Sequence, residues 1–362
     1  MSGRLYVFAG GGTGGHLFPG IAVADRLVQR EPDARIRFLG TDRSVEREIL
    51  SKTGYDHVPL VREGNRRLWS RIRNLASGYR SALDLMRKDR PAAVIGCGGG
   101  ASVAPILTAR RLRVPVFLLE QNVIPGRTTR LLARLGTSVC LTYPESATLL
   151  SKSARIRVTG NPVRQLISDL SMSPFPIAES PHQQTLLVLG GSQGAHSIND
   201  TMIRFAEHDS RPLDGWRIIH QTGTTDAEVV RAVYGRLGLD ALVESFFDDM
   251  VPHYRNSDMV VSRSGGTTLS ELACAGLPAL LVPYPFAKDD HQTANANIFV
   301  QNEAADLIPT LNTEDGQKEF MRILGNYLSH PELRLKRAQH MRSLARPRAA
   351  EEIASLVISE ST

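Results

Sequence analysis

The sequence has few cysteines and no long apolar run. None of its apolar stretches reaches the roughly 18 residues that a membrane-spanning helix requires, so we expect no such helix. The three cysteines, Cys97, Cys140 and Cys274, are odd in number and widely spaced, which argues against a disulfide framework or a structural zinc site. The first residues enter an apolar segment at Leu5 and meet glycine at Gly10, without the layout of a cleavable signal peptide. These absences predict a reducing compartment, and the cytoplasm is the plainest choice.

The chain is long, and its charge is unevenly divided. At 362 residues it exceeds what one ordinary core holds, so we expect two domains. The net charge is +6, but residues 1–165 carry 27 Lys and Arg against 12 Asp and Glu, whereas the rest of the chain is acidic. A basic N-terminal half indicates an anionic partner, for which nucleic acid, anionic lipid and a phosphorylated substrate are the candidates.

Short apolar runs alternate with helix-length amphipathic stretches in both halves of the chain. Runs rich in Val, Ile and Leu that are separated by helices are typical of a parallel sheet covered on both faces. The sequence therefore predicts an α/β fold with two doubly wound, Rossmann-like domains. Residues 168–184, with three prolines and no helical period, are the expected linker, and 331–358 are expected to be helical with a break at Pro347. The expected strands cover residues 5–9, 36–39, 93–95, 116–119, 138–141, 185–189, 217–220, 259–261 and 279–282.

Three glycine-rich turns, at residues 10–16, 96–102 and 190–195, each follow an expected strand and precede an expected helix. Glycine lets the backbone turn tightly and approach a ligand, and free N–H groups at a helix start attract anions. Three such turns predict phosphate-bearing ligands, although strand–helix packing alone also explains a glycine after a strand. Gly10, Gly12 and Gly15 also match the dinucleotide-binding spacing, with Asp42 as a candidate ribose ligand, so an NAD-dependent enzyme stays open.

A longer series of motifs runs through the second half of the chain. It comprises GNPVR at 160–164, GGSQGA at 190–195, FFDDM at 246–250, SRSGGTTLSE at 262–271, GLP at 276–278 and DHQTANA at 290–296. With the first glycine loop, these motifs closely resemble the MurG family of peptidoglycan glycosyltransferases, from Gly10 to about Ala296. The resemblance implies a GT-B fold, in which two Rossmann-like domains face a cleft. The implied parts are an acceptor and membrane domain at 1–163, a donor domain at 164–340, and a helix at 341–362 that packs back on the first domain.

The resemblance also implies an activity. It is the inverting transfer of N-acetylglucosamine from UDP-N-acetylglucosamine to the C4 hydroxyl of MurNAc in undecaprenyl-pyrophosphoryl-MurNAc-pentapeptide (lipid I), which forms lipid II. No cofactor and no essential metal are implied. The implied partners are UDP-N-acetylglucosamine, the undecaprenyl-linked acceptor, an anionic membrane surface and cell-wall synthesis proteins, with no nucleic acid. The implied location is peripheral, on the cytoplasmic face of the inner membrane.

The implied donor site lies mainly in the second half of the chain. Glu271 would bind the ribose hydroxyls, Phe247 would offer backbone groups to uracil, and Gln292 would read sugar hydroxyls. Ser192 and the segment 266–270 would meet the diphosphate, which Arg164 would neutralise. The full implied donor set is Thr13, Gly14, Gly15, Asn122, Arg164, Ser192, Gln193, Gly194, Phe247, Gly266, Thr267, Thr268, Leu269, Ser270, Glu271 and Gln292.

The acceptor hydroxyl needs a general base, and His16 is the favoured candidate because an imidazole titrates near neutral pH. Glu120 is the second catalytic candidate, either as the base or as the group that orients His16; a structural histidine is the remaining alternative. The acceptor side departs from the family at Leu119, where a His is usual, and at Gly100, where a Tyr is usual. The implied acceptor or phosphate loop consists of Gly98, Gly99 and Ser102.

Residues 62–90 combine nine Lys and Arg side chains and three acids with apolar residues at helical spacing. An interfacial element that contacts anionic lipid has this composition, and so does an ordinary core helix with solvated arginines. The predicted membrane contacts are Arg66, Arg67, Leu68 and Trp69.

Three rival functions remain at this point. The glycine spacing supports an NAD- or nucleotide-dependent enzyme, and the basic half supports a non-catalytic membrane or nucleic-acid binding module. A related lipid glycosyltransferase with a different acceptor is the third rival, since the departures lie on the acceptor side.

Overall fold

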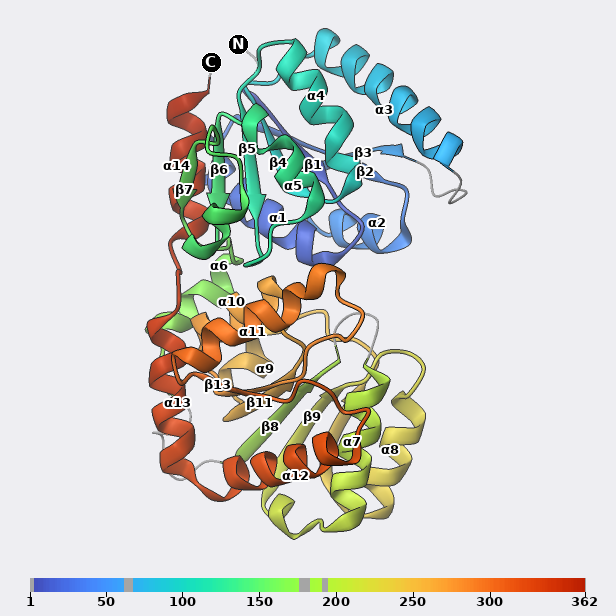
Figure 1. The fold of residues 1–362 in the computed structure, drawn as a ribbon, viewed down its shortest axis with the longest axis vertical. Helices are drawn as coiled ribbons and strands as arrows, with labels where there is room; N and C mark the ends of the chain where they lie inside the picture. The colour runs from blue at the N-terminus through green and yellow to red at the C-terminus, as the bar shows by residue number, and fades with distance from the viewer. Residues whose placement is uncertain (1–2, 62–67, 176–182, 191–194, 362) are drawn as a thin grey trace. The chain divides into compact units, whose positions relative to one another are not determined.

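The computed structural model describes residues 3–61, 68–175, 183–190 and 195–361. The chain divides into two compact units, Met1–Arg164 with Arg346–Thr362 (unit 1) and Gln165–Ala345 (unit 2). Each unit is an open parallel β-sheet with helices on both faces (Figure 1). The predicted fold class, two Rossmann-like α/β domains, is therefore confirmed.

Unit 1 contains a seven-stranded sheet in the order β3-β2-β1-β4-β5-β6-β7, in which every neighbouring pair is parallel. The strand order reverses beside β1, so the loops after β1 and β4 lie next to each other at the carboxyl edge, where α/β sheets bind ligands. The strands are β1 (Leu5–Gly10), β2 (Arg35–Thr41), β3 (Asp56–Val61), β4 (Ala93–Gly98), β5 (Val116–Glu120), β6 (Ser138–Leu141) and β7 (Ile156–Val158). The main helices are α1 (Gly14–Arg30), α2 (Ser44–Ser51), α3 (Leu68–Lys88), α4 (Val103–Arg111), α5 (Arg127–Leu132) and α14 (Ala349–Glu360).

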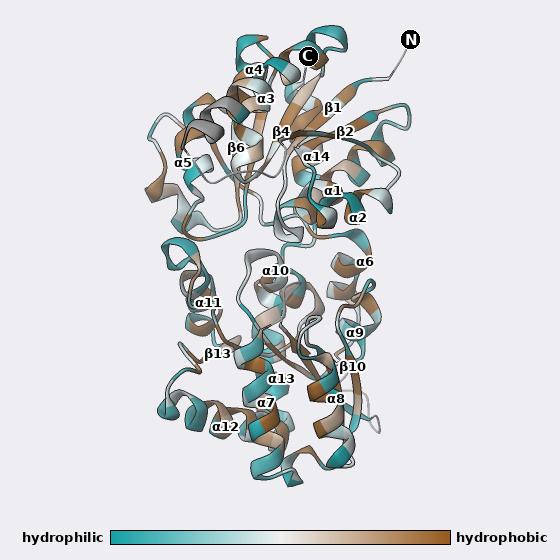
Figure 2. Ribbon diagram, turned by 90° about the vertical axis from the view of Figure 1, so that its right-hand side faces the viewer, coloured by the Kyte–Doolittle hydropathy of each residue, from teal (hydrophilic) through white to brown (hydrophobic). Residues whose placement is uncertain are grey.

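Strand β1 is buried along its whole length because it supplies side chains to two cores. Tyr6 and Phe8 belong to the core on one face of the sheet, and Leu5, Val7 and Ala9 belong to the core on the other. The last helix, α14, packs on α1 and adds apolar side chains to the first of these cores. In Figure 2 the hydrophobic colour accordingly follows the strands, and the outer turns of the helices are hydrophilic.

Unit 2 contains a six-stranded parallel sheet in the order β10-β9-β8-β11-β12-β13. Its strands are β8 (Gln184–Leu189), β9 (Trp216–Gln221), β10 (Asp240–Glu244), β11 (Met259–Ser262), β12 (Ala279–Leu281) and β13 (Ala305–Leu307). Its helices are α6 (Gln165–Ser168), α7 (His196–His208), α8 (Ala227–Arg236), α9 (Val251–Arg255), α10 (Gly266–Ala275), α11 (His291–Gln301), α12 (Glu314–Ser329) and α13 (Pro331–Ser343).

All nine expected strands are present, but four more were missed. The missed strands, β3, β7, β10 and β13, are the edge strands of the two sheets. An edge strand pairs on one side only and is short or partly polar, so it lacks the apolar run that marks an inner strand. The expectation of no helix in 168–184 is wrong at its start, where Asp169–Met172 forms a 3-10 turn. The expected break at Pro347 lies between α13 and α14.

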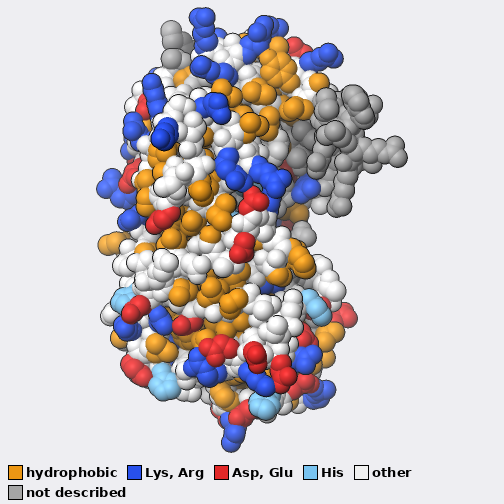
Figure 3. Space-filling view, viewed as in Figure 1, with side chains coloured by type: hydrophobic (Ala, Val, Ile, Leu, Met, Phe, Trp, Pro, Cys, Tyr) orange, Lys and Arg blue, Asp and Glu red, His pale blue; other side chains and the backbone are white. Residues whose placement is uncertain are grey.

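None of the helices in the described ranges is both long enough and apolar enough to cross a membrane. The three cysteines are free and buried, and burial raises the pKa of the Cys97 and Cys140 thiols to about 12. On the face drawn in Figure 3, Lys and Arg predominate over unit 1, whereas both signs are interspersed over unit 2.

His220 on β9 is a fully buried histidine that is held neutral. Its Nδ1 lies 3.0 Å from the Tyr234 hydroxyl, and its Nε2 lies 3.0 Å from Oδ1 of Asn199. The Asn199 amide nitrogen donates to Thr222 and Asp226, so its Oδ1 is the acceptor and Nε2 of His220 carries the proton. Nδ1 then accepts from the tyrosine. Burial, offset in part by Asp226, lowers the pKa of His220 from 6.5 to about 3.

This depressed pKa predicts acid lability. The stabilisation is complete above pH 6.5 and is lost as the pH falls from 6.5 toward 3, because the unfolded state binds a proton that the folded state excludes. The loss approaches about 1.4 kcal/mol per pH unit within this window. Thermal denaturation of wild type and His220→Gln at pH 7.5 and pH 5 should show the larger fall in Tm for wild type. Equal falls would contradict the assignment.

Candidate functional site

The predicted residues of unit 1 gather at the carboxyl edge of its sheet. Gly10 at the end of β1 pairs with Gly98 at the end of β4, which places the first two glycine turns side by side. Glu120 ends β5, the next strand of the sheet. In the first turn Thr13 and Gly15 are exposed.

His16, on the first turn of α1, fits tightly between these two glycine turns. A Cβ atom on Gly98 would lie 2.9 Å from Cδ2 of His16, and one on Gly99 would lie 3.0 Å from the Gly11 carbonyl oxygen. Both glycines have positive φ, 103° and 76°, so backbone conformation and space both require glycine here. Nδ1 of His16 lies 3.2 Å from the Gly11 carbonyl oxygen. A carbonyl oxygen only accepts hydrogen bonds, so Nδ1 must carry the proton of the neutral imidazole. Nε2 is then the nitrogen that can take a second proton.

Glu120 is occupied by its own loop. Its Oε1 accepts from the backbone and side-chain nitrogens of Asn122 at 3.1 and 3.3 Å, and its Oε2 accepts from the Gly126 N–H at 2.9 Å. The carboxylate is almost fully buried by these contacts. The Gly11 carbonyl is the group bound to Nδ1 of His16, and the role of Glu120 as base or orienting group stays a prediction.

The Ser102 side chain is bound within the second glycine turn. Its hydroxyl donates to the Gly99 carbonyl at 2.7 Å, and the residue is buried. The side chain therefore closes the second glycine turn, and its part in the acceptor loop stays a prediction. Gly98 and Gly99 are partly exposed. An anion could therefore reach the backbone of these two residues in the predicted acceptor loop.

In unit 2 the segment 266–270 forms the start of α10. The helix begins at Gly266, after the N-cap Gly265, and its first-turn N–H groups have no acceptor within the helix. Such amides attract anions. The side chain of Leu269 is fully buried and the Ser270 hydroxyl donates back to Gly266 at 2.9 Å, so the side chains of these two residues are turned to the protein.

Glu271 lies on the second turn of α10 with one oxygen already bound. Its Oε2 accepts from the Tyr254 hydroxyl at 2.9 Å, and both residues are buried. Tyr254 belongs to α9, so the two helices jointly set the direction of the carboxylate. Sequence reasoning missed Tyr254, because no pattern marks a tyrosine 17 residues away as a partner.

Two other predicted donor residues are also held in place. Oε1 of Gln292 accepts from the Tyr284 N–H at 2.9 Å, which leaves the amide NH2 of Gln292 as the donor end. The Phe247 N–H, predicted to face uracil, donates instead to Oε1 of Gln221 at 3.1 Å. Gln221 is buried at the end of β9 and is a second residue that sequence reasoning missed.

Two arginines, Arg164 and Arg263, make contacts within their own units. The Arg164 guanidinium stacks over the Phe18 ring at 4.6 Å. Arg263, which carried no prediction, donates to the carbonyls of Val282 and Pro283 and to the Ser197 hydroxyl. It thus joins the ends of β11 and β12 to the start of α7, and burial lowers its pKa below the usual range.

The adjacent acids Asp289 and Asp290 lie directly before α11. Asp289 and Asp290 both adopt left-handed backbone, with φ of 55° and 52°, and Asp290 accepts from the Thr293 hydroxyl at the start of α11. In the part of the chain that the structure describes, no three His, Cys, Asp or Glu side chains gather as metal ligands would.

Several predicted residues lie outside the described residues. These are Ser192, Gln193, Gly194, Arg66 and Arg67, together with the side chains of Leu68 and Trp69 at the start of α3.

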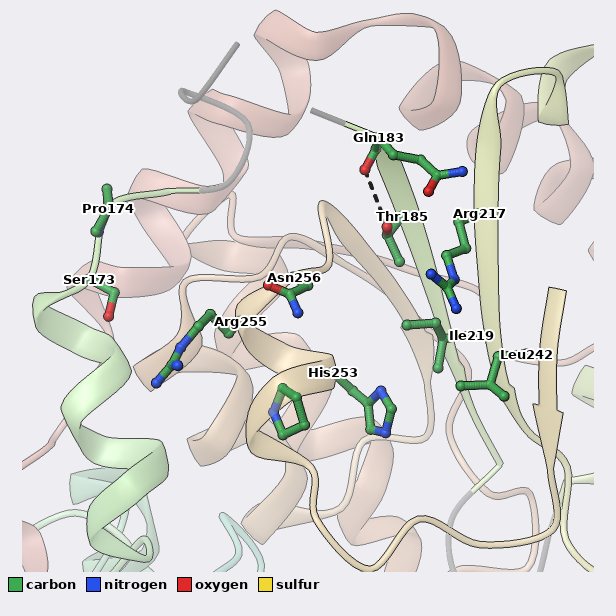
Figure 4. A pocket seen from close by; sticks show the side chains of 11 residues that line it. Ser173, Pro174, Gln183, Thr185, Arg217, Ile219, Leu242, His253, Arg255 and Asn256 are labelled. Carbon is green, nitrogen blue, oxygen red and sulfur yellow. Dashed lines mark hydrogen bonds between the residues drawn. The ribbon is translucent and has the colours of Figure 1, made fainter. Parts of the chain in front are cut away.

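A cavity of about 610 Å³ opens in unit 2 between β8–β10 and α9 (Figure 4). Its walls include Thr185 and Arg217, near the amino ends of β8 and β9, and His253 of α9. The predicted donor residues follow the carboxyl ends of the strands, and none of them lines this cavity. The cavity is therefore separate from the candidate site.

Comparison with known proteins gives matches along most of the chain. Residues 6–141 match the glycosyltransferase family 28 N-terminal domain, and residues 185–341 match the glycosyltransferase family 28 C-terminal domain. The UDP-N-acetylglucosamine–N-acetylmuramyl-(pentapeptide) pyrophosphoryl-undecaprenol N-acetylglucosamine transferase of Desulfotalea psychrophila is 40% identical over 308 residues, 83% of this chain and 82% of the relative. The protein of the same name from Geotalea uraniireducens is 37% identical over 356 residues, 96% of each chain.

Solved structures agree with these relatives. The crystal structure of Acinetobacter baumannii MurG superposes with a TM-score of 0.78 at 27% identity, covering 98% of this chain and 99% of that one. A UDP-GlcNAc 2-epimerase from Neisseria meningitidis, solved with UDP-GlcNAc bound, has a TM-score of 0.66 at 15% identity, over 99% of this chain and 100% of that one. This second likeness shows a shared fold alone.

The Tyr254–Glu271 contact predicts a selective effect on the expected ligand. Tyr254→Phe removes the hydroxyl that directs Glu271, so the Kd for UDP, measured by calorimetry, should rise about 10-fold. Tyr327→Phe is the matched control, because it also removes a buried tyrosine hydroxyl from a carboxylate, that of Asp306. A Kd unchanged in Tyr254→Phe, or raised equally in both variants, would show that Glu271 is not directed by Tyr254.

Proposed function

Because this chain belongs to the MurG family of N-acetylglucosaminyltransferases, we propose that it transfers N-acetylglucosamine from UDP-N-acetylglucosamine to the MurNAc C4 hydroxyl of undecaprenyl-pyrophosphoryl-MurNAc-pentapeptide. The carrying observation is the 37% identity that extends over 96% of both this chain and a relative named for this transfer. Such coverage includes both Rossmann-like units, so the whole of a two-domain transferase is matched.

We propose that unit 2 binds the donor. The first-turn amides of α10 would meet the diphosphate, and the Glu271 carboxylate, directed by Tyr254, would accept the ribose hydroxyls. The free NH2 end of Gln292 would donate to a sugar hydroxyl. For uracil to use the Phe247 N–H, the Gln221 side chain would have to release it.

His16 is the proposed general base. Its Nε2 would take the proton of the C4 hydroxyl as that oxygen forms the new bond to the anomeric carbon. The bond from the anomeric carbon to UDP breaks on the opposite side, which inverts the configuration. The electron pair leaves with UDP, whose growing negative charge the α10 amides would stabilise.

The dinucleotide alternative fits this chain less well. An NAD pyrophosphate would need the N–H groups of the first glycine loop, yet the Gly12 N–H already donates to the Glu46 carboxylate at 2.5 Å. A second anion at that amide would also be repelled by the carboxylate. The relatives named above support the transferase and not the dehydrogenase or the nucleic-acid binding module.

The transfer can be tested directly. With radiolabelled UDP-N-acetylglucosamine and a lipid I analogue, wild type should form a labelled lipid product, and other UDP-sugars should give little. His16→Ala should lower turnover by about 100-fold or more, since it removes the base. His208→Ala, at an exposed histidine of unit 2, is the control and should retain turnover. No labelled lipid with wild type would end the proposal, and near-normal turnover in His16→Ala would remove His16 from this role.

We also propose that the protein works peripherally on the cytoplasmic face of the inner membrane, where a lipid-linked acceptor would be found. The described part of α3 supports a mixed role for this basic segment. Ala82 and Met86 are buried in unit 1, whereas Leu75, Arg80 and Arg87 are exposed. One side of the helix therefore packs in the core, and the other presents basic and apolar groups.

The basic segment at residues 62–90 predicts binding to anionic vesicles. Leu68→Ser and Trp69→Ser remove apolar contacts, and Arg66→Glu and Arg67→Glu reverse charge, so the combined variant should sediment at least 10-fold less with vesicles containing anionic lipid. Val229→Ser, at an exposed apolar residue of α8, is the control. Unchanged sedimentation of the combined variant would place the membrane contact elsewhere.

A further inference from the structure

The peptide group between Gly11 and Gly12 forms a hydrogen bond at each end. Its carbonyl oxygen, on Gly11, lies 3.2 Å from Nδ1 of His16. Its N–H, on Gly12, donates to Oε1 of Glu46 at 2.5 Å. A peptide group is planar, so the direction of its N–H sets the direction of its carbonyl. Glu46 and His16 are thus joined through one rigid unit.

Glu46 is a buried carboxylate with contacts to two segments. It lies on α2 and is fully buried, and its Oε1 also accepts from the Thr41 hydroxyl at 2.5 Å. Its Oε2 accepts from the Thr41 N–H at 2.8 Å. The same side chain therefore joins the loop after β1 to the end of β2. Burying a carboxylate costs free energy unless hydrogen-bond donors compensate for the lost water. The same hydrogen bonds fix the positions of the donors.

Two glycines make room for this carboxylate. A Cβ atom on Gly11 would lie 2.4 Å from Oε1 of Glu46, and one on Gly40 would lie 2.3 Å from Oε2. Both distances are too short for a Cβ atom unless the carboxylate moves, so glycine at both positions lets Glu46 keep its place. The glycine at position 11 is therefore explained by a group inside the protein, independently of any ligand that approaches the loop.

We propose that Glu46 is a positioning residue for the base of the proposed transfer, acting through the Gly11–Gly12 peptide group on His16. The carboxylate orients and polarises this peptide group, which strengthens its carbonyl as an acceptor for the His16 Nδ1–H. The imidazole is held with Nε2 free of a proton, and the positive charge that it gains on taking the acceptor proton is stabilised. The expected effect on kcat rests on the proposed function, whereas the effect on the His16 ring does not.

Two charged or titratable groups of the described contacts face this arrangement. The Arg43 guanidinium donates to the Gly12 carbonyl at 3.1 Å, and Nε2 of His57, on β3, lies 3.8 Å from Oε2 of Glu46. His57 is the histidine near this carboxylate, so a control variant has to replace it.

The test compares Glu46→Gln with two matched variants. Glu46→Gln removes the charge and, because its amide NH2 would face an N–H donor in either orientation, leaves one donor unsatisfied. Thr41→Val deletes one hydrogen bond to the same carboxylate but keeps the charge, and His57→Gln removes the neighbouring titratable group. Each is measured for kcat and KM across pH 5.5–9, for UDP binding, and by ¹⁵N NMR of the His16 ring.

In Glu46→Gln we expect kcat to fall about 10- to 100-fold, the loss of a hydrogen bond to a charged group. The acidic limb of its pH–rate profile should move to lower pH, because the imidazolium loses its stabilisation, while UDP affinity stays normal. The NMR spectrum should lose the Nδ1-protonated form that wild type shows. Thr41→Val and His57→Gln should keep kcat within about three-fold of wild type and leave the acidic limb in place.

A normal kcat and an unmoved limb in Glu46→Gln would overturn the proposal, as would an equal loss in Thr41→Val, which would indicate general destabilisation. The NMR result does not depend on turnover. If wild type transfers no sugar, the proposed function fails while the ring spectra still decide whether Glu46 controls His16. An unchanged His16 spectrum in Glu46→Gln would then overturn the proposal.

Discussion

The parallel pairing of β1 with β4 is the constraint on which the functional end of unit 1 depends. Because parallel strands end at the same edge, the loops after β1 and β4 must meet there, and Gly10 and Gly98 face each other across the ladder. The two strands cannot slip, since the alternate side chains of β1 fill two separate cores. This fixed pairing brings the His16 ring against Gly98, where a Cβ atom would lie only 2.9 Å from Cδ2 of the ring.

Each unit also depends on polar groups that are buried with their partners. In unit 1 the Glu46 carboxylate joins the first glycine loop to β2. In unit 2 the Asp258 carboxylate accepts from the Thr185 N–H at 2.7 Å, and Tyr254 directs Glu271. Burying a polar group costs free energy unless a partner forms a hydrogen bond with it. Removing one partner therefore leaves the other with its full desolvation penalty. These pairs make the loops rigid near the positions where ligands are proposed to bind.

The sequence predicted the motif residues better than it predicted the residues that bind to them. The first two glycine turns and the inner strands follow from local patterns, and the structure has them. Ser102 and Glu120 fit the same pattern, yet their side chains are turned to the protein, because a spacing does not specify which way a side chain points. Glu46 and Gln221 lie in no motif, and Arg263 lies in one without a predicted role, because the backbone groups that they bind are distant in the sequence.

The sequence by itself determined the two-domain α/β architecture, the places of the loops, and the family, because these depend on apolar periodicity and on ordered motifs. It could not determine why Gly11 is a glycine, which group binds Nδ1 of His16, or which residue binds Oε2 of Glu271. Those depend on contacts between segments that are separated by tens of residues, such as α2 with the loop after β1. Only the packed sheet brings these segments together, because strand order and register, rather than neighbourhood in the chain, decide which polar groups meet.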